Sequence, residues 1–385
     1  MPSPPRSLWR PDLLLVLCLL AFAAGKRLVL LPVWTQLDLD VYRTGAANLA
    51  AGNALYEVVP GQYPFTYPPF AAILMLPLGH MVRAAAIAAT ATLSLAAFAL
   101  ICAITTSNLR IDRRLGWFLA LGAITLQPVY QTFELGQVNL VLMALVMVDC
   151  LILPPRYRGL GVGLAAGIKI VPGIFVLYFV LRRDWRAVAQ SCLTFAATLL
   201  VSAIAVPHET LSYWTHLMDD AARTGDTISS VNQSAPAVLA RLMHDRYPPT
   251  ALVALVGVCT IAFAVLAARK ELARGHDLAA LVCIAIGGLL ASPVSWSHHY
   301  VWAVPALIIL FVEKRTFAAA MGAALFYVAP MQNIPFNHGV ELTYGPWELF
   351  VSAAYPLAAL LWLATRLFAR STASSRDVRD LTTLA

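Results

Sequence analysis

The chain has 385 residues, of which 60% are hydrophobic and only 12% are charged, and its mean hydropathy is +0.73. Apolar stretches of about 20 residues recur from end to end, which excludes a soluble enzyme with one anchor and predicts an all-α polytopic membrane protein. The net charge of +7 comes from short basic clusters between these stretches. Such clusters indicate which connections lie in the cytoplasm, and they predict no nucleic-acid-binding surface.

Ten full crossings are predicted, to which shorter re-entrant or interfacial segments are added. The first, at 12–31, lacks the cleavage site of a signal peptide and is expected to remain in the protein. The crossings are expected at 12–31, 84–106, 116–133, 137–153, 187–206, 249–268, 277–293, 299–313, 315–331 and 346–368.

Two further apolar segments do not fit the regular alternation of connections between the two sides of the membrane. Residues 68–82 are short and proline-marked, and they are expected to lie at the outer interface. Residues 159–181 have arginines on both flanks, and Lys169 stands with Gly167 and Pro172 at their midpoint. This pattern predicts two half-helices joined by a break, with Lys169 at the tip of a re-entrant pair.

The short connections rich in Arg and Lys are expected in the cytoplasm, together with both termini. One transmembrane domain is predicted over 1–385, with a disordered cytoplasmic tail at about 371–385. The segments expected outside are 32–67, 128–140, 207–248, 292–300 and 330–347, and they contain nearly all the polar residues useful for chemistry. A site is therefore expected to face outward.

Two carboxylates, Asp38 and Asp40, follow the first apolar stretch, where charge is tolerated only if it is hydrated or paired. Asp38 is interpreted as a catalytic base and Asp40 as the second candidate. The alternative is that one of them, Asp40 above all, caps a helix from Val41 to Leu49. Arg43 is close enough in sequence to hold either carboxylate ionised. A nucleotide-sugar metal site is disfavoured because no phosphate-binding glycine loop accompanies the Asp-x-Asp pattern.

Aromatic residues in 64–70, including Tyr67, are interpreted either as an aromatic belt or as a wall beside the carboxylates. The run 292–300 places three serines, Trp296, His298 and His299 at the mouth of a crossing, which favours a polar cavity over lipid. Lys169 and the two histidines are the candidates for binding a phosphate. The alternatives are a snorkelling lysine and structural histidines.

Carboxamides at Gln137, Asn139 and Gln233 suit sugar hydroxyls, although such groups also cap helices and join membrane helices. Asn232 begins an N-glycosylation pattern that has meaning only in a eukaryotic secretory pathway. The six cysteines lie in apolar segments without metal-site spacing, so neither a metal site nor a disulfide framework is predicted.

Taken in order, these motifs resemble glycosyltransferase family 87, membrane mannosyltransferases of the GT-C superfamily. The resemblance rests on 38–43, 64–70, 136–139, 168–172, 232–234 and 292–299. It implies the GT-C fold, an inverting transfer from polyprenyl-phosphate-mannose, and a catalytic aspartate in the first outside loop, which falls on Asp38. It also implies a glycolipid acceptor such as a phosphatidylinositol mannoside or lipomannan, an alpha-1,2 linkage, and no cofactor.

The resulting hypothesis is a plasma-membrane hexosyltransferase with its site on the outer face. Lys169, His298 and His299 are expected at the donor phosphate, and Tyr67, Gln137, Asn139, Gln233 and Trp296 at the sugars. One alternative is the same fold acting on lipid-linked arabinofuranose or glucose. The other, a lipid-linked sugar transporter, predicts internal repeats and polar residues that continue to the cytoplasmic side, and neither is evident in the sequence.

Overall fold

The computed structural model describes residues 35–368 apart from 58–60, 62 and 219. The predicted first crossing at 12–31 and the tail at 371–385 therefore lie outside the described residues. Within the described part every regular element is helical, apart from one isolated antiparallel bridge between Asn232 and Trp296. This confirms the predicted all-α class.

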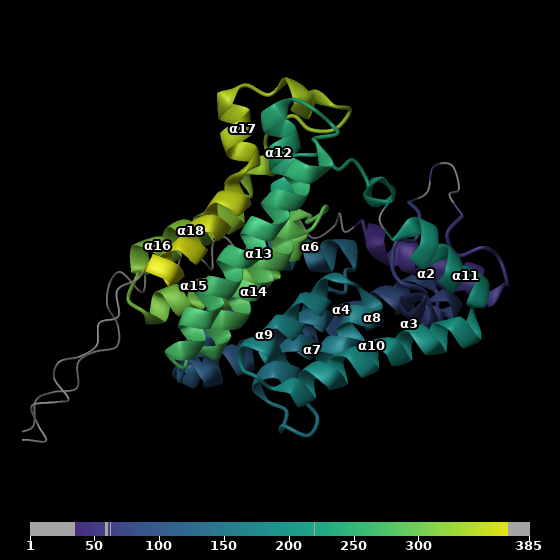
Figure 1. Ribbon diagram of the computed structural model, residues 1–385, viewed down its shortest axis with the longest axis horizontal. Helices are drawn as coiled ribbons and strands as arrows, with labels where there is room; N and C mark the ends of the chain where they lie inside the picture. Colours follow the sequence, from purple (N-terminus) through teal and green to yellow (C-terminus); the bar gives the residue numbers. More distant parts are fainter. Residues whose placement is uncertain (1–34, 58–60, 62, 219, 369–385) are drawn as a thin grey trace, which may run out of the picture.

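The first half of the chain contains α2 (Leu37–Ala50), α3 (Pro69–His80), α4 (Arg83–Asn108), α5 (Arg113–Ala123), α6 (Gln127–Leu135), α7 (Asn139–Leu151), α8 (Leu160–Ile168), η2 (Val171–Phe175), α9 (Val176–Leu181) and α10 (Trp185–Ala205). Helices α2, α3 and α11 lie together at one end of the molecule in Figure 1.

The second half contains α11 (Pro207–Ser212), η3 (Tyr213–Leu217), η4 (Ala221–Thr224), α12 (Ala235–Met243), α13 (Thr250–Ala273), α14 (Asp277–Ala291), η5 (Ser297–Trp302), α15 (Ala303–Val312), α16 (Thr316–Val328), η6 (Pro330–Gln332), η7 (Val340–Thr343), α17 (Pro346–Ser352) and α18 (Ala354–Phe368). Helix α14 is central, since every residue from Leu278 to Leu290 is buried, as expected of a helix that is apolar on all sides.

Three described helices, α4, α10 and α13, are long and apolar enough to cross a membrane. The number rises to five if the bent pairs α6–α7, at 118°, and α17–α18, at 62°, each form one span. The predicted crossings at 277–293, 299–313 and 315–331 appear as shorter apolar helices. The apolar helices make this a multi-pass membrane protein.

The predicted crossing at 116–133 is wrong as a single helix. Helix α5 ends at Ala123, and α6 begins at Gln127 with Pro128 in its first turn. Proline lacks an amide proton and clashes with the preceding turn, so it is favoured at a helix start and disfavoured inside a helix. The break releases α6 to lie across the end of α7.

The predicted break at the midpoint of 159–181 is confirmed. Lys169 leaves α8 with extended backbone angles (φ −148°, ψ 128°), and the chain resumes as η2. An ion pair between Arg158 and Asp184, with 3.8 Å between Nη1 and Oδ2, joins the two ends of the segment. The segment is therefore a helical hairpin with Lys169 near its tip. At this tip Lys169 contacts Asn139 of α7 and His299 of η5.

Candidate active site

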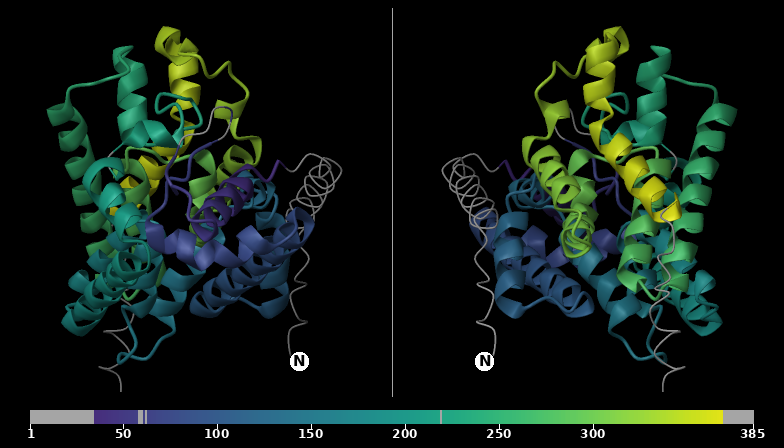
Figure 2. Two further views of the ribbon diagram at one scale, coloured as in Figure 1. Left: turned by 90° about the vertical axis from the view of Figure 1, so that its right-hand side faces the viewer. Right: turned by 90° about the vertical axis from the view of Figure 1, so that its left-hand side faces the viewer.

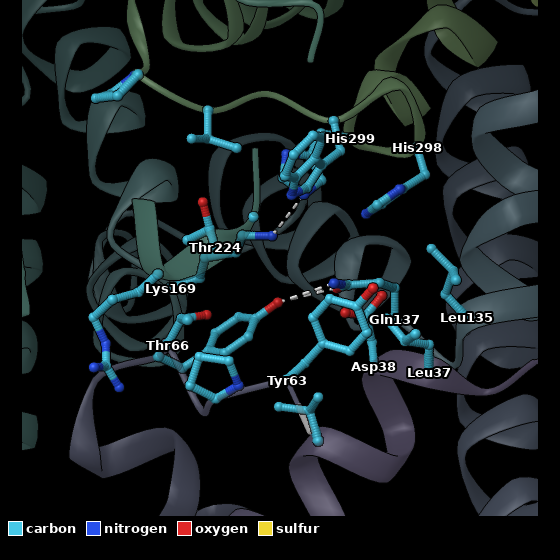
Figure 3. Close-up of a pocket in the computed structure, with 18 of the residues that line it drawn as sticks. Leu37, Asp38, Tyr63, Thr66, Leu135, Gln137, Lys169, Thr224, His298 and His299 are labelled. Atoms are coloured by element: carbon cyan, nitrogen blue, oxygen red, sulfur yellow. Dashed lines mark hydrogen bonds between the residues drawn. The ribbon is translucent and has the colours of Figure 1, made fainter. Parts of the chain in front are cut away.

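A cavity of about 930 Å³ lies where α2, α6, the tip of the 159–181 hairpin and η5 meet. Figure 3 shows Asp38, Gln137, Lys169, His298 and His299 converging on it from these separate elements. Residues within 63–68, 220–231 and 292–296 also line it, together with Gln332, Phe336 and Asn337. Segments that the sequence analysis expects outside therefore share one cavity.

Asp38 is held in place through the residue that precedes its helix. Gln36 adopts left-handed backbone angles (φ 55°) and donates its amide Nε2 to the carbonyl oxygens of Phe133 (2.9 Å) and Glu134 (3.2 Å). These bonds join the start of α2 to the end of α6. Asp38 lies in the first turn of α2, where the helix dipole stabilises a carboxylate.

The Asp38 carboxyl lines the cavity, and its buried Oδ2 has no hydrogen-bond partner among the described residues. Burial raises the pKa of Asp38 to about 6, while the charge of Lys169 and the side chain of Gln137 oppose this rise. A carboxylate with a raised pKa and an unused oxygen is suited to accept a proton.

Asp40 does not line the cavity. Its carboxylate accepts two hydrogen bonds from Arg83, with 2.9 Å from Nη2 to Oδ2, and lies 3.6 Å from Arg43 Nη1. The expected helix start at Val41 is wrong because α2 already begins at Leu37, so neither aspartate is its N-cap. Asp40 ties α2 to the start of α4, and Asp38 is the carboxylate that faces the cavity.

Lys169 places a cation in the cavity, where it contacts several predicted site residues. Its Nζ donates to Asn139 Oδ1 (3.3 Å) and to His299 Nε2 (3.1 Å), and it lies 5.4 Å from the centre of the Tyr67 ring. An ammonium group has no lone pair, so His299 accepts through an unprotonated Nε2. In Figure 3 the Lys169–His299 contact stands across the cavity from Asp38.

His298 also lines the cavity, and its ring stands nearly perpendicular to that of His299 at 4.7 Å. Its Nε2 is buried without a hydrogen-bond partner in the described part of the chain. Its backbone carbonyl accepts from Asn139 Nδ2 at 3.1 Å. The structure thus brings together both predicted histidines and Lys169, and Asn139 contacts Lys169 and the His298 carbonyl.

Aromatic side chains form one wall of the cavity, which favours the wall over the lipid belt for this segment. Tyr67 is buried. Its hydroxyl contacts the hydroxyl of Tyr42 (2.9 Å) and accepts from the amide Nε2 of Gln137 (3.0 Å). Tyr56 donates its hydroxyl to the Tyr67 carbonyl (2.8 Å), and its ring stacks on Tyr213 at 5.6 Å. Among the predicted sugar-binding residues, Tyr67, Gln137 and Trp296 line this cavity.

Two predicted sugar-binding residues are placed differently. Gln233 is fully buried away from the cavity, where it donates to the carbonyls of Ser230 and Ser352 and accepts from the Tyr355 amide. Asn139 contacts Lys169 and the His298 carbonyl but not the large cavity. Both carboxamides bind neighbouring parts of the protein, and their assignment to direct sugar contact stays a prediction.

Sequence reasoning missed a cluster of neutral polar groups on the same cavity. Gln131, Ser297 and Gln332 line it, with 3.3 Å between Ser297 Oγ and Gln131 Oε1 and 3.4 Å between Gln332 Nε2 and Ser297 Oγ. Behind them Gln127 Nε2 donates to Ser297 Oγ at 2.8 Å. Gln131 and Gln332 had no signal in the sequence beyond their position in segments expected outside, whereas Ser297 belongs to the polar run 292–300. Among the described residues, no three His, Cys, Asp or Glu side chains group as a metal site would require.

Comparisons with known proteins show which family the chain resembles. The sequence model of glycosyltransferase family 87 matches residues 65–293. The chain is 33% identical to a protein of Mycobacterium tuberculosis named polyprenol-phosphate-mannose-dependent alpha-(1-2)-phosphatidylinositol mannoside mannosyltransferase, with 90% of this chain and 88% of the relative covered.

A protein of the same name from Mycolicibacterium smegmatis is 34% identical over 91% of this chain and 87% of its own length. A second M. tuberculosis protein, named as the corresponding pentamannoside mannosyltransferase, is 36% identical over 94% of this chain and 89% of its own. No solved structure matches significantly. The matched family model, the near full-length similarity and the helical membrane fold establish that the chain belongs to glycosyltransferase family 87.

Proposed function

We propose that this protein transfers mannose from polyprenyl-phosphate-mannose to a phosphatidylinositol mannoside or a related glycolipid, with inversion at the anomeric carbon. The observation that carries the proposal is the placement of Asp38 opposite Lys169 and His299 on one cavity. The names of the relatives supply the donor and acceptor classes and the alpha-(1-2) linkage.

Asp38 acts as the general base. The acceptor hydroxyl oxygen attacks the anomeric carbon as its proton passes to the Asp38 carboxylate. A carboxylate whose pKa is near 6 is ionised at neutral pH and is a stronger base than an unperturbed aspartate. A single in-line displacement inverts the configuration and needs no second carboxylate as nucleophile, which agrees with the position of Asp40 outside the cavity.

Lys169 stabilises the leaving group. When the bond between the anomeric carbon and the phosphate oxygen breaks, its electron pair leaves with polyprenyl phosphate. The ammonium of Lys169 compensates the developing charge, and Asn139 and His299 hold that ammonium in place. His298, whose Nε2 is free of partners in the described chain, is positioned to contact a phosphate oxygen or a sugar hydroxyl.

Hydroxyl groups of the sugars meet neutral donors and acceptors. Tyr67, Gln137 and Trp296 belong to the aromatic side of the cavity, and Gln131, Ser297 and Gln332 form a second polar group. Carboxamides both donate and accept, so they pair with hydroxyls without adding charge near the reacting carbon. These residues are our candidates for sugar recognition.

Both substrates are lipids, which explains a site built among membrane helices. Their acyl and polyprenyl chains remain in the bilayer while their polar heads reach the cavity. The positive-inside distribution supports a cavity on the outer face of the plasma membrane and cytoplasmic termini.

The test is transfer by purified protein in nanodiscs, with radiolabelled polyprenyl-phosphate-mannose and a mixture of phosphatidylinositol mannosides. The unmodified protein is expected to label the glycolipid, and an alpha-specific exomannosidase is expected to release the label. Asp38→Asn is expected to lower the turnover number ~10²- to 10⁴-fold because a general base contributes that much.

Asp40→Asn is the matched control, since it makes the same change two residues away and outside the cavity. It is expected to retain most of the activity because its ion pair with Arg83 is partly exposed and contributes little. Equal loss in the two variants would contradict the assignment of the base. Transfer from polyprenyl-phosphate-arabinofuranose or polyprenyl-phosphate-glucose, but not from the mannose donor, would contradict the assignment of the sugar.

A further inference from the structure

A second cationic side chain reaches the cavity from a segment that the reaction just described does not use. Arg223, in η4, lines the cavity and is half-buried. Its Nη2 donates to the Tyr56 carbonyl at 2.8 Å, and in the described part of the chain it forms no ion pair. A guanidinium has five N–H donors, so most of those of Arg223 remain for a ligand.

The two acidic residues nearest to Arg223 in the sequence, Asp220 and Asp226, form no ion pair with it in the described part of the chain. Asp226 also lines the cavity, but its carboxylate is paired with Arg246, at 2.6 Å between Nη1 and Oδ1. Asp220 lines the cavity as well and is exposed to water, which screens its charge. A guanidinium that keeps its charge on a cavity wall can bind an anion.

Arg223 and Lys169 lie at two ends of the aromatic wall. Arg223 contacts the Tyr56 carbonyl, the Tyr56 hydroxyl contacts the Tyr67 carbonyl, and Lys169 lies over the Tyr67 ring. In the view of Figure 3, Thr224, which follows Arg223, lies on the same side of the cavity as Thr66. The aromatic wall therefore carries two cations, Arg223 at the Tyr56 carbonyl and Lys169 at the Tyr67 ring.

We propose that Arg223 binds the phosphodiester of the acceptor headgroup. This assignment rests on the proposed function. The donor brings one phosphate, which is bonded to the reacting carbon and is therefore fixed near Lys169. A phosphatidylinositol acceptor brings one phosphodiester of its own, some distance from the reacting hydroxyl, and this second anion requires a second cation. The planar guanidinium suits it because it pairs with two phosphate oxygens at once.

The test compares two acceptors that differ in this phosphate. One is a phosphatidylinositol mannoside, and the other is a neutral alkyl mannoside. Arg223→Gln is expected to raise KM for the phosphate-bearing acceptor ~10- to 100-fold, because hydrogen bonds to charged groups are lost. KM for the alkyl mannoside and KM for the donor are expected to change less than about twofold.

Two further variants make the test specific. Arg83→Gln removes the same charge outside the cavity and is expected to leave the ratio of the two acceptor KM values unchanged. Arg223→Lys keeps the charge without the planar fork and is expected to give an intermediate ratio. The ratio is internal to each variant, so a uniform loss of activity from poorer folding does not alter it.

The failures of this inference and of the proposed function differ. Transfer by the unmodified protein to neither acceptor would overturn the mannosyltransferase, and the role of Arg223 with it. Transfer to both acceptors with an unchanged KM ratio in Arg223→Gln would overturn the role of Arg223 alone. A raised donor KM with both acceptors would also overturn it, by assigning Arg223 to the donor.

Discussion

Asp38 and Asp40 have the same side chain and stand two residues apart, yet the fold gives them opposite environments. Two residues correspond to about 200° around an α-helix, so they face opposite sides of α2. Asp38 faces the cavity and has one oxygen without a partner among residues 35–368 as the structure describes them, whereas Asp40 faces Arg83. The position of a carboxylate on its helix thus separates a candidate base from an ion pair.

The raised pKa of Asp38 predicts how transfer depends on pH. Burial favours the protonated acid, and the base works only when ionised, so kcat/KM is expected to be constant above about pH 7. It is expected to fall through a midpoint near pH 6 and to approach a tenfold loss per pH unit below the midpoint. The substrate phosphodiesters do not titrate in this range, so the midpoint reports on the protein.

The measurement is kcat/KM from pH 4.5 to 8.5 in nanodiscs, with the thermal midpoint recorded at each pH to exclude unfolding. A midpoint near 4 would show that Asp38 has the pKa of an ordinary aspartate. A profile that is flat down to pH 5 would therefore contradict the raised pKa of Asp38.

Sequence reasoning identified residue types at the site better than their contacts. Asp38, Lys169, His298 and His299 were predictable because charged and titratable groups in apolar surroundings require a polar cavity. Gln233 was predicted at the sugars, and in the structure it binds backbone groups, because a carboxamide suits a sugar hydroxyl and a backbone carbonyl equally well. Only the tertiary structure, which places Ser352 and Tyr355 around it, decides between these partners.

At the scale of elements, the position of α2 depends on the sharp turn between α6 and α7. Gly136 ends α6 with φ +70°, and a Cβ at this glycine would lie 2.6 Å from Leu39 Cβ and 2.8 Å from Gln36 Oε1. The absence of a side chain at Gly136 therefore lets the start of α2 approach α6. This close approach brings Asp38 to the cavity.

Gly136→Ala is expected to displace the first turn of α2 and to lower kcat at least tenfold, because small displacements of a catalytic group are costly. Gly275→Ala is the matched control, since Gly275 also has positive φ (+78°) but has open space around its Cβ position. Both variants bear the strain of alanine at positive φ, about 1–2 kcal/mol. Only Gly136→Ala bears the clash.

Transfer kinetics and thermal midpoints of the two variants separate these effects. Both midpoints are expected to fall by similar amounts, and only the Gly136→Ala protein is expected to lose turnover. Normal turnover in Gly136→Ala would show that the position of Asp38 does not depend on the contact between α2 and α6.

The long helices were predictable from hydropathy alone, and the breaks required local chemistry. Helices α4, α10 and α13 lie within a few residues of their predicted ranges because apolar length is a strong signal. The break at Lys169 was predictable from the glycine and proline beside it. The break before α6 was missed although Pro128 marks it, because the apolar stretch continues across it.

At the scale of the whole molecule, the basic connections gather at one end. The ion pair of Arg158 with Asp184 and that of Arg182 with Asp277 join three connections between helices. The pair of Arg366 with Glu313 joins α18 to the connection after α15. Helices α12 and α17, in contrast, lie together at the upper end in Figure 2. The grouping of the basic connections supports the proposed orientation, with this end in the cytoplasm.

The orientation predicts which of two exposed tyrosines a membrane-impermeant maleimide reaches after replacement by cysteine. Tyr63 lines the cavity and is 61% exposed, whereas Tyr157 is 46% exposed beside Arg156 in a basic connection. In intact cells Tyr63→Cys is expected to react and Tyr157→Cys to react only after permeabilisation. The unmodified protein supplies the background of the native cysteines, whose thiols in apolar surroundings react poorly.

The paired design separates orientation from accessibility. Because the same substitution is made at two exposed positions, reaction of both after permeabilisation shows that both thiols are available. Labelling of Tyr157→Cys alone in intact cells would place the cavity in the cytoplasm, contrary to the proposal. The donor and the acceptor headgroup would then have to reach Asp38 and Lys169 from the inner leaflet. The labelled side therefore fixes the leaflet in which the lipid donor must be presented to this enzyme.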